Sequence, residues 1–193
     1  DRSVSRGLGD VYKRQALGQG NYDTSELIFE NMLNEDPYSN HLWNRLASAQ
    51  MMHEKIDDSI TSSEYAIAIN PDDDEALLNK ANALFRLGKY DEALEYYRRF
   101  THLCPENHSG YILQGNTLIN LARPEEAIAA YRQAESKIGN NESDIIEIFQ
   151  ELALTLSSIG KKEEALEYVK KAENYPSVSY THLRAHETLS DLV

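Results

Sequence analysis

The sequence predicts an all-α protein, built as a solenoid of stacked antiparallel helix hairpins. The clearest hairpin spans Asp74–Asn107, where apolar residues recur three and four positions apart in two stretches separated by Gly88. Such a stripe is a helix face that one hairpin cannot bury alone. Pro37, Pro71 and Pro105 recur at one constant interval, each at the end of a helical pattern. A fixed period of about 34 residues indicates repeated hairpins that bury their apolar faces against one another.

Other positions keep the same interval. The turn inside successive hairpins is expected at Gly20, Glu54, Gly88 and Ala122. Small residues recur at the eighth place of successive units, at Ala47, Ala81 and Gly115. We expect helices to cross closely there, because a large side chain at such a crossing overpacks and costs about 1–3 kcal/mol.

These positions divide the chain into units in one register. The array is expected over residues 16–176, as about four full repeats and a partial N-terminal one. The predicted units are residues 6–39, 40–73, 74–107, 108–141 and 146–179. The last unit starts four residues late, so we expect one linker or helix to be about a turn longer.

The pattern resembles the tetratricopeptide repeat (TPR) family, whose repeat reads Trp-x2-Leu-Gly-x2-Tyr, then Ala-x3-Phe, then Pro. The unit at 40–73 supplies Trp43, Leu46, Ala47, Gln50, Ser59, Ser63, Ala66 and Pro71. The unit at 74–107 supplies Leu77, Lys80, Ala81, Leu84, Ala93, Tyr97, Phe100 and Pro105. The resemblance implies a right-handed α-solenoid that acts as a non-enzymatic protein-interaction scaffold and binds a peptide or helix in its concave groove.

The two ends do not continue the pattern. Residues 1–15 and 177–193 resemble translated sequencing-adaptor sequence, so we treat them as a non-native leader and tail and leave them out of the fold prediction. We expect the native protein to extend beyond both ends.

Composition restricts the partners. The chain has 19 Lys and Arg against 32 Asp and Glu, a net charge of −13, which disfavours binding to nucleic acid or to an anionic membrane. No stretch of about 18 apolar residues is present, so no membrane insertion is expected. The single cysteine, Cys104, excludes an internal disulfide and favours the cytoplasm.

No pattern predicts catalysis or a cofactor. His102, Cys104 and His108 are metal-ligand types, but no fourth ligand is evident and Pro105 interrupts the segment, so we expect no metal site. Neither a glycine-rich phosphate loop nor a Gly-x-Ser-x-Gly motif is present, and the chain is not expected to be an enzyme. Trp43 could stack on a ligand, but its helical spacing favours a place in the core.

The family resemblance places the binding surface on the first helix of each hairpin. The residues expected there are Asn44, Arg45, Ser48, Asn79, Asn82, Phe85, Asn116 and Asn120. Asparagine suits this role because its amide both donates to and accepts from a peptide backbone. Of the residues with which chaperone-docking members hold a terminal carboxylate, only Asn79 is present, so chaperone C-terminal tails are not expected partners.

Two other functions stay open. The array could be a regulatory or spacer segment of a larger enzyme or sensor whose catalytic domain is missing. It could also be a self-associating array, because Leu166 and Val169 lie on a last helix with no polar capping helix after it. The sequence does not name a protein or peptide partner.

Overall fold

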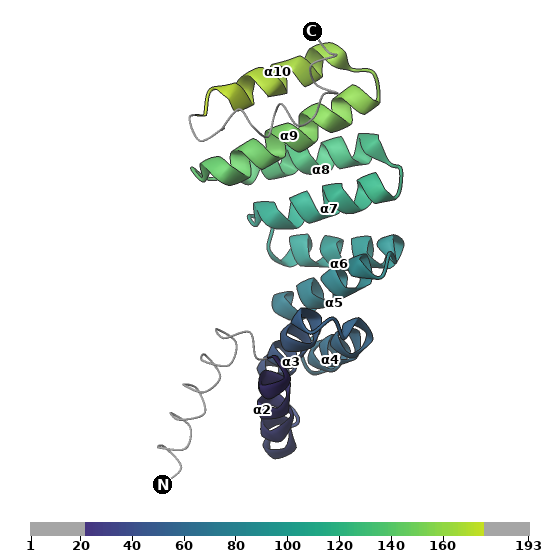
Figure 1. Ribbon diagram of the computed structural model, residues 1–193, viewed down its shortest axis with the longest axis vertical. Coiled ribbons are helices and arrows are strands. Elements are labelled where there is room, and N and C mark those ends of the chain that lie inside the picture. Colours follow the sequence, from purple (N-terminus) through teal and green to yellow (C-terminus); the bar gives the residue numbers. More distant parts are fainter. Residues whose placement is uncertain (1–21, 176–193) are drawn as a thin grey trace. The chain divides into compact units, whose positions relative to one another are not determined.

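The computed structural model describes residues 22–175. The predicted leader (1–15), the first helix of the partial repeat and the predicted tail (177–193) lie outside the described residues. The described part forms nine helices and no strand (Figure 1). The helices are α2 (Tyr22–Glu35), α3 (Asn40–Met52), α4 (Ile56–Ile69), α5 (Asp74–Arg86), α6 (Tyr90–Leu103), α7 (His108–Asn120), α8 (Pro124–Lys137), α9 (Glu142–Ser158) and α10 (Lys162–Glu173).

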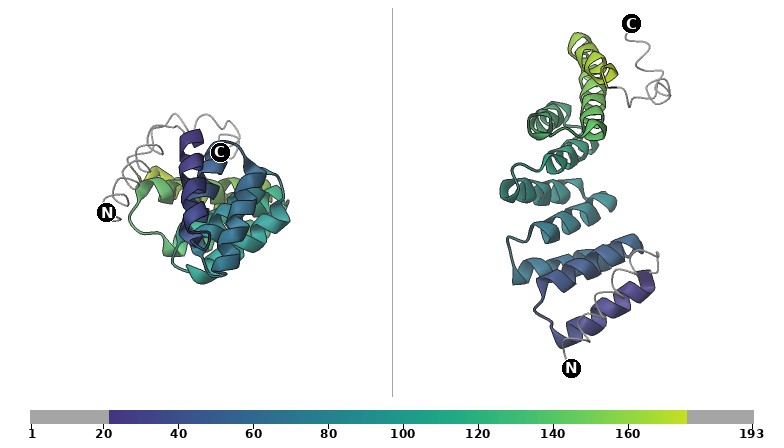
Figure 2. Two further views of the ribbon diagram at one scale, coloured as in Figure 1. Left: turned by 90° about the horizontal axis from the view of Figure 1, so that it is seen from below. Right: turned by 90° about the vertical axis from the view of Figure 1, so that its left-hand side faces the viewer.

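The helices fall into two compact units, one up to Leu103 and one from Cys104. In the first unit, α2 packs against α3, and the hairpins α3–α4 and α5–α6 pack through α4 and α5 (Figure 2). In the second unit, the hairpins α7–α8 and α9–α10 pack through α8 and α9. Four hairpins preceded by one further helix confirm the predicted all-α fold.

Every first helix that follows another repeat begins with the same cap. Ser39, Asp73, Asn107 and Asn141 occupy one register of the repeat and are the N-cap residues of α3, α5, α7 and α9. Each side chain accepts a hydrogen bond from a backbone N–H in the first turn. Such a cap contributes about 1 kcal/mol and fixes the residue at which the helix starts.

The turn inside each hairpin uses a left-handed residue, at the predicted positions Glu54, Gly88 and Ala122 and also at Gly160, whereas the predicted turn at Gly20 lies outside the described residues. The φ angles are 62° at Glu54, 74° at Gly88, 55° at Ala122 and 80° at Gly160. Only glycine adopts this conformation without steric cost. The first helices α3, α5 and α7 have 13 residues each, whereas α9 has 17. The four extra residues of the last predicted unit therefore lengthen a helix.

The small residues at the eighth place lie in close helix crossings, as predicted. Ala47 and Ala81 are completely buried. At Gly115 a Cβ atom would lie 2.3 Å from Cε1 of Tyr131, so the second-helix ring packs directly on the glycine. The buried tyrosines Tyr97 and Tyr131 thus form the centre of their hairpins.

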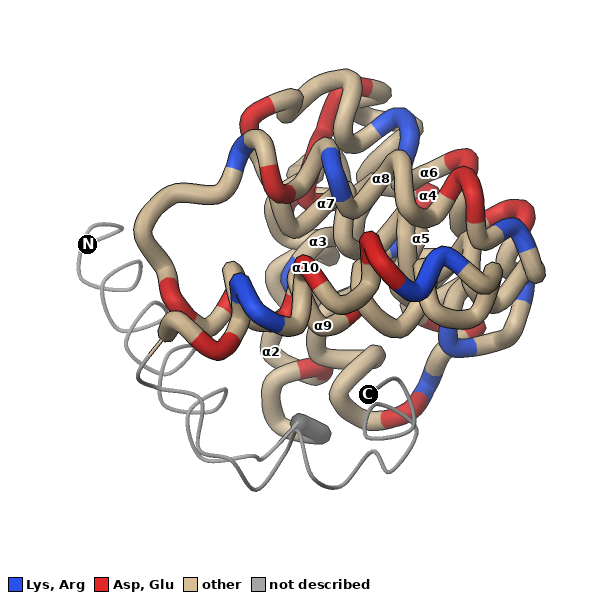
Figure 3. The backbone as a smooth tube through the Cα atoms, turned by 90° about the horizontal axis from the view of Figure 1, so that it is seen from above, with Lys and Arg blue, Asp and Glu red and all other residues tan. Residues whose placement is uncertain are grey.

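Much of the negative charge has a local structural role. Two acidic residues lie in the first turn of α4, α5, α6, α8, α9 and α10, where they complement the helix dipole (Figure 3). No helix formed by residues 22–175 is long and apolar enough to cross a membrane.

Candidate protein-interaction surface

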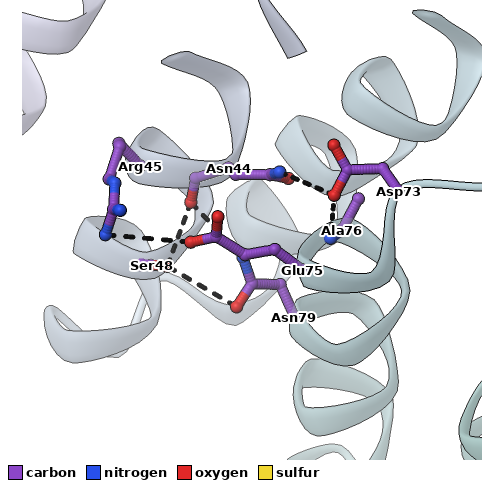
Figure 4. A network of polar contacts seen from close by, with 7 residues as sticks. All are labelled: Asn44, Arg45, Ser48, Asp73, Glu75, Ala76 and Asn79. Atoms are coloured by element: carbon purple, nitrogen blue, oxygen red, sulfur yellow. Dashed lines mark hydrogen bonds and ion pairs between the residues drawn. The ribbon is translucent and has the colours of Figure 1, made fainter. Parts of the chain in front are cut away.

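A polar network joins the first helices α3 and α5 in the first unit (Figure 4). Asn44 is only 2% exposed, and its Nδ2 donates to Oδ1 of Asp73 at 2.9 Å. The same carboxylate oxygen accepts the Ala76 N–H at 2.9 Å, and the other accepts from Asn40. Asp73 therefore caps α5 and holds α3 beside it.

The network continues through two further predicted site residues. The backbone oxygen of Asn44 accepts from Ser48 Oγ at 3.0 Å and from Asn79 Nδ2 at 3.3 Å (Figure 4). Nη1 of Arg45 and Oε1 of Glu75 lie 3.8 Å apart at the exposed side of the network. Asn44 is thus buried and positions the two helices, whereas Arg45, Ser48 and Asn79 are half-buried and reach the surface.

Asn82 on α5 is oriented by a tyrosine of the paired helix. Tyr97 Oη donates to Asn82 Oδ1 at 2.7 Å. Burial raises the pKa of the Tyr97 hydroxyl well above its usual value, so the hydroxyl keeps its proton. This bond occupies the carbonyl end of the amide, and Nδ2 of Asn82 has no partner within residues 22–175.

The second unit repeats this arrangement in the same register. Tyr131 Oη donates to Asn116 Oδ1 at 2.6 Å, and Nδ2 of Asn116 also lacks a partner in the described part of the chain. The pKa of Tyr131 is raised by burial and further by the nearby carboxylates of Glu151 and Glu147. Each tyrosine therefore holds the carbonyl end of one first-helix amide.

The last two predicted residues lie beside these amides. Phe85 is half-buried and meets the ring of Tyr90 edge to face at 5.3 Å. Asn120 is exposed, and its Nδ2 donates to the Asn116 carbonyl at 2.8 Å. The orienting role of Tyr97 and Tyr131 was not predicted from the sequence, although the same separation between asparagine and tyrosine recurs in both repeats.

The described residues hold no group of three or more His, Cys, Asp and Glu side chains that could bind a metal ion.

Comparisons with known proteins agree with this architecture. Two sequence profiles described as tetratricopeptide repeat match residues 44–108 and residues 108–136 and 146–175, which together are more than half of the chain. Protein STIP1 homolog of Dictyostelium discoideum is 27% identical over 78 residues, which are 40% of this chain and 14% of that protein.

Solved structures show the same fold. MamA (residues 41 to the end) from Desulfovibrio magneticus RS-1 superposes with a TM-score of 0.78 at 16% identity, over 87% of this chain and 93% of that one. The TPR protein TTC0263 of Thermus thermophilus gives a TM-score of 0.66 at 20% identity, over 97% and 99%. The constant repeat register, the helix hairpins and these matches lead to one conclusion: the chain belongs to the tetratricopeptide repeat family.

Proposed function

We propose that this protein is a non-enzymatic scaffold that binds a peptide or helix of a partner protein on its first-helix surfaces. We define these surfaces as the exposed faces of α3 and α5 in the first unit and of α7 and α9 in the second. The recurrent tyrosine–asparagine pair is the observation that carries the proposal. Two amides in equivalent places are held in one orientation, each with unpaired donors.

The chemistry of these amides suits a peptide backbone. An N–H group fixed before binding loses little conformational freedom when it donates to a backbone carbonyl, so more of the hydrogen-bond energy appears as affinity. Phe85 adds an apolar contact beside Asn82, and Arg45 adds a cation that is 43% exposed. The surface of the first unit can therefore bind a backbone and discriminate among side chains.

Two features restrict the kind of partner and the compartment in which it is met. Asn79 already bonds Asn44 and Ser48, so the one residue that fits the carboxylate-binding pattern is partly occupied. We therefore do not propose chaperone C-terminal tails as ligands. We place the interaction in the cytoplasm, consistent with a single cysteine.

A second proposal is that the array supports or regulates a larger protein. The match to the STIP1 homolog favours it, because the aligned segment is a small part of that protein's length. A peptide selection separates the two proposals.

A random-peptide display selection against the chain tests the scaffold proposal. Selected peptides are then titrated by fluorescence anisotropy against the wild type and against a variant with Asn82→Ala and Asn116→Ala. Because the two amides lie in separate units, a peptide bound at either one loses one hydrogen bond, which predicts roughly 2- to 12-fold weaker binding. A matched control carries Asn31→Ala and Asn140→Ala, which change one exposed asparagine in each unit away from the first-helix surfaces.

The proposal predicts that only the first variant loses affinity while both keep the helical circular dichroism of the wild type. Equal affinity of the first variant and the wild type would contradict it. Failure to select any peptide would favour the supporting role in a larger protein.

A further inference from the structure

The first unit has an open cleft of about 430 Å³ between α2 and α4, with α3 at its base. Its apolar lining includes Leu33 of α2 and Trp43 and Leu46 of α3. Two carboxylates also line it, Glu30 of α2 and Asp58 of α4. Because the cleft involves α2 and α4, it is separate from the first-helix surfaces proposed above.

Three polar groups at the base of the cleft already have hydrogen-bond partners. The indole N–H of Trp43 donates to the Pro37 carbonyl at 2.9 Å, and its ring stacks on Tyr65 with centroids 4.5 Å apart. Ser62 Oγ donates to Oε1 of Gln50 at 2.7 Å. The base therefore offers apolar and aromatic surface, with few further hydrogen bonds.

The carboxylates at the rim of the cleft, by contrast, are not paired with any group of residues 22–175. Glu30 and Asp58 are both exposed, and neither has an ion-pair or hydrogen-bond partner within the described residues. In this part of the chain, no lysine, arginine or histidine lines the cleft. An occupant with an apolar stem and a cationic end would complement both parts.

The next repeat shows such an occupant in place. Lys80 occupies the register of Leu46 in the following unit, and its Nζ binds Glu64 Oε1 at 2.8 Å and Tyr96 Oη at 2.8 Å. The same ammonium lies 4.5 Å from the centroid of the Tyr96 ring. Its side chain is only 11% exposed. Burial disfavours the charge, but the bonds to Glu64 and Tyr96 outweigh it and the pKa of Lys80 is raised.

The cleft between α2 and α4 has the glutamate of this arrangement but lacks its lysine and its tyrosine. Glu30 occupies the register of Glu64. Leu46 and Ser62 stand in the registers of Lys80 and Tyr96, so both the cation and the ring are missing. The loss of these two large side chains accounts for the open space.

The second unit supports the same chemistry. Phe149 occupies the register of Trp43 in the last hairpin, once the four extra residues of α9 are counted. Lys171 Nζ lies 5.4 Å from the Phe149 ring centroid and 3.0 Å from Glu135 Oε1. A lysine over an aromatic ring and beside a carboxylate thus occurs elsewhere in the chain, with Lys171 and Glu135 in the registers of Tyr65 and Leu33.

We infer that the cleft between α2 and α4 binds a lysine or arginine side chain of a partner peptide, in the place that Lys80 fills in the next repeat. The aliphatic stem lies along Leu33, Leu46 and Trp43, and the cationic end reaches Glu30 and Asp58. The partner is therefore a basic segment, which the net charge of −13 also favours over an acidic one.

Trp43 gives a direct assay because it is the only tryptophan of the chain. The probes are short Gly/Ser peptides that carry one central lysine, arginine or citrulline, the last being a neutral analogue of arginine. Binding is followed by the NMR resonance of the Trp43 indole and by its fluorescence. The lysine and arginine peptides are expected to give saturable shifts that weaken with salt, and the citrulline peptide none.

Variants locate the effect. Glu30→Gln with Asp58→Asn is expected to weaken binding by up to about fivefold for each carboxylate removed. Glu35→Gln with Asp57→Asn removes the same charge from exposed positions outside the cleft and is expected to leave binding nearly unchanged. Leu46→Lys with Ser62→Tyr copies the next repeat and is expected to abolish peptide binding by filling the cleft.

Three results would overturn the inference. One is the absence of any shift with the lysine and arginine peptides. Another is an equal shift with the citrulline peptide. The third is an equal loss of binding in the Glu35 and Asp57 control, which would assign the effect to net charge.

Discussion

Replacing Gly115 by alanine separates packing from helix propensity, because the two predict opposite signs. Gly115 lies inside α7, where alanine is intrinsically favoured over glycine by about 1 kcal/mol. The added Cβ would lie 2.3 Å from Cε1 of Tyr131, more than 1 Å inside an ordinary carbon contact of about 3.5 Å. Tyr131 is fully buried, so its ring has no free space into which to move.

The magnitude follows from three contributions. Overpacking in a close crossing costs about 1–3 kcal/mol. Displacement of the Tyr131 ring weakens its 2.6 Å hydrogen bond to Asn116, which costs about 1 kcal/mol more. Helix propensity offsets about 1 kcal/mol, so we expect Gly115→Ala to lower the free energy of unfolding by about 1–3 kcal/mol.

Urea unfolding followed by far-UV circular dichroism measures this change, and hydrogen exchange locates it to α7 and α8. Gly139→Ala is the matched control, because a Cβ there meets no atom within 4 Å. In a Tyr131→Leu background the clash is removed, and Gly115→Ala should become neutral or stabilising. A Gly115→Ala protein as stable as the wild type, or more stable, would refute the close crossing.

Three further changes test other parts of the structure. Asp73→Ala removes the N-cap of α5 and leaves the buried amide of Asn44 without this partner, so the free energy of unfolding in urea should fall by about 2–4 kcal/mol. Asp72→Ala, at the exposed neighbouring residue, should leave it nearly unchanged. Ala122→Gly relieves a left-handed φ of 55° and should raise stability by about 0.5–1 kcal/mol in the same assay; a lower urea midpoint would contradict this. Above about pH 10 the unfolded state loses tyrosine protons that buried Tyr97 and Tyr131 retain, so stability should fall by up to about 1.4 kcal/mol per pH unit for each. Phenylalanine at both positions should flatten this alkaline fall in the urea midpoints, and an unchanged slope would show that these hydroxyls do not cause it.

The hairpins could be predicted from sequence because the signals are local and repeated. Pro71 and Pro105 end helical patterns one repeat apart, and Gly88 takes the left-handed turn between α5 and α6. Every unit buries the same face, so a stripe seen in one hairpin applies to its neighbours.

The surface residues were harder to predict because their state depends on distant partners. Asn44 was expected in the groove, but Asp73, 29 residues later, binds its amide in the core. Periodicity assigns a residue to a helix face, but it does not show whether a neighbouring helix covers that face. Asn82 and Asn116 are bound within their own hairpins, by Tyr97 and Tyr131.

The cleft between α2 and α4 could not be predicted from periodicity, because it results from missing side-chain volume. Leu46 and the aliphatic stem of Lys80 occupy the same register, and both fit the apolar pattern of the repeat. Only the contacts of Lys80 with Glu64 and Tyr96 show what the equivalent space lacks.

We propose that amides fixed by buried tyrosines bind a partner peptide. The most direct test is an NMR titration of the side-chain NH₂ resonances of Asn82 and Asn116 with a peptide from the display selection. We expect the resonance of at least one of these amides to shift saturably, and Tyr97→Phe with Tyr131→Phe to weaken binding while the helices remain folded. Shifts confined to α4, α6, α8 and α10, with both amides unchanged, would contradict it and move the binding site to the second helices.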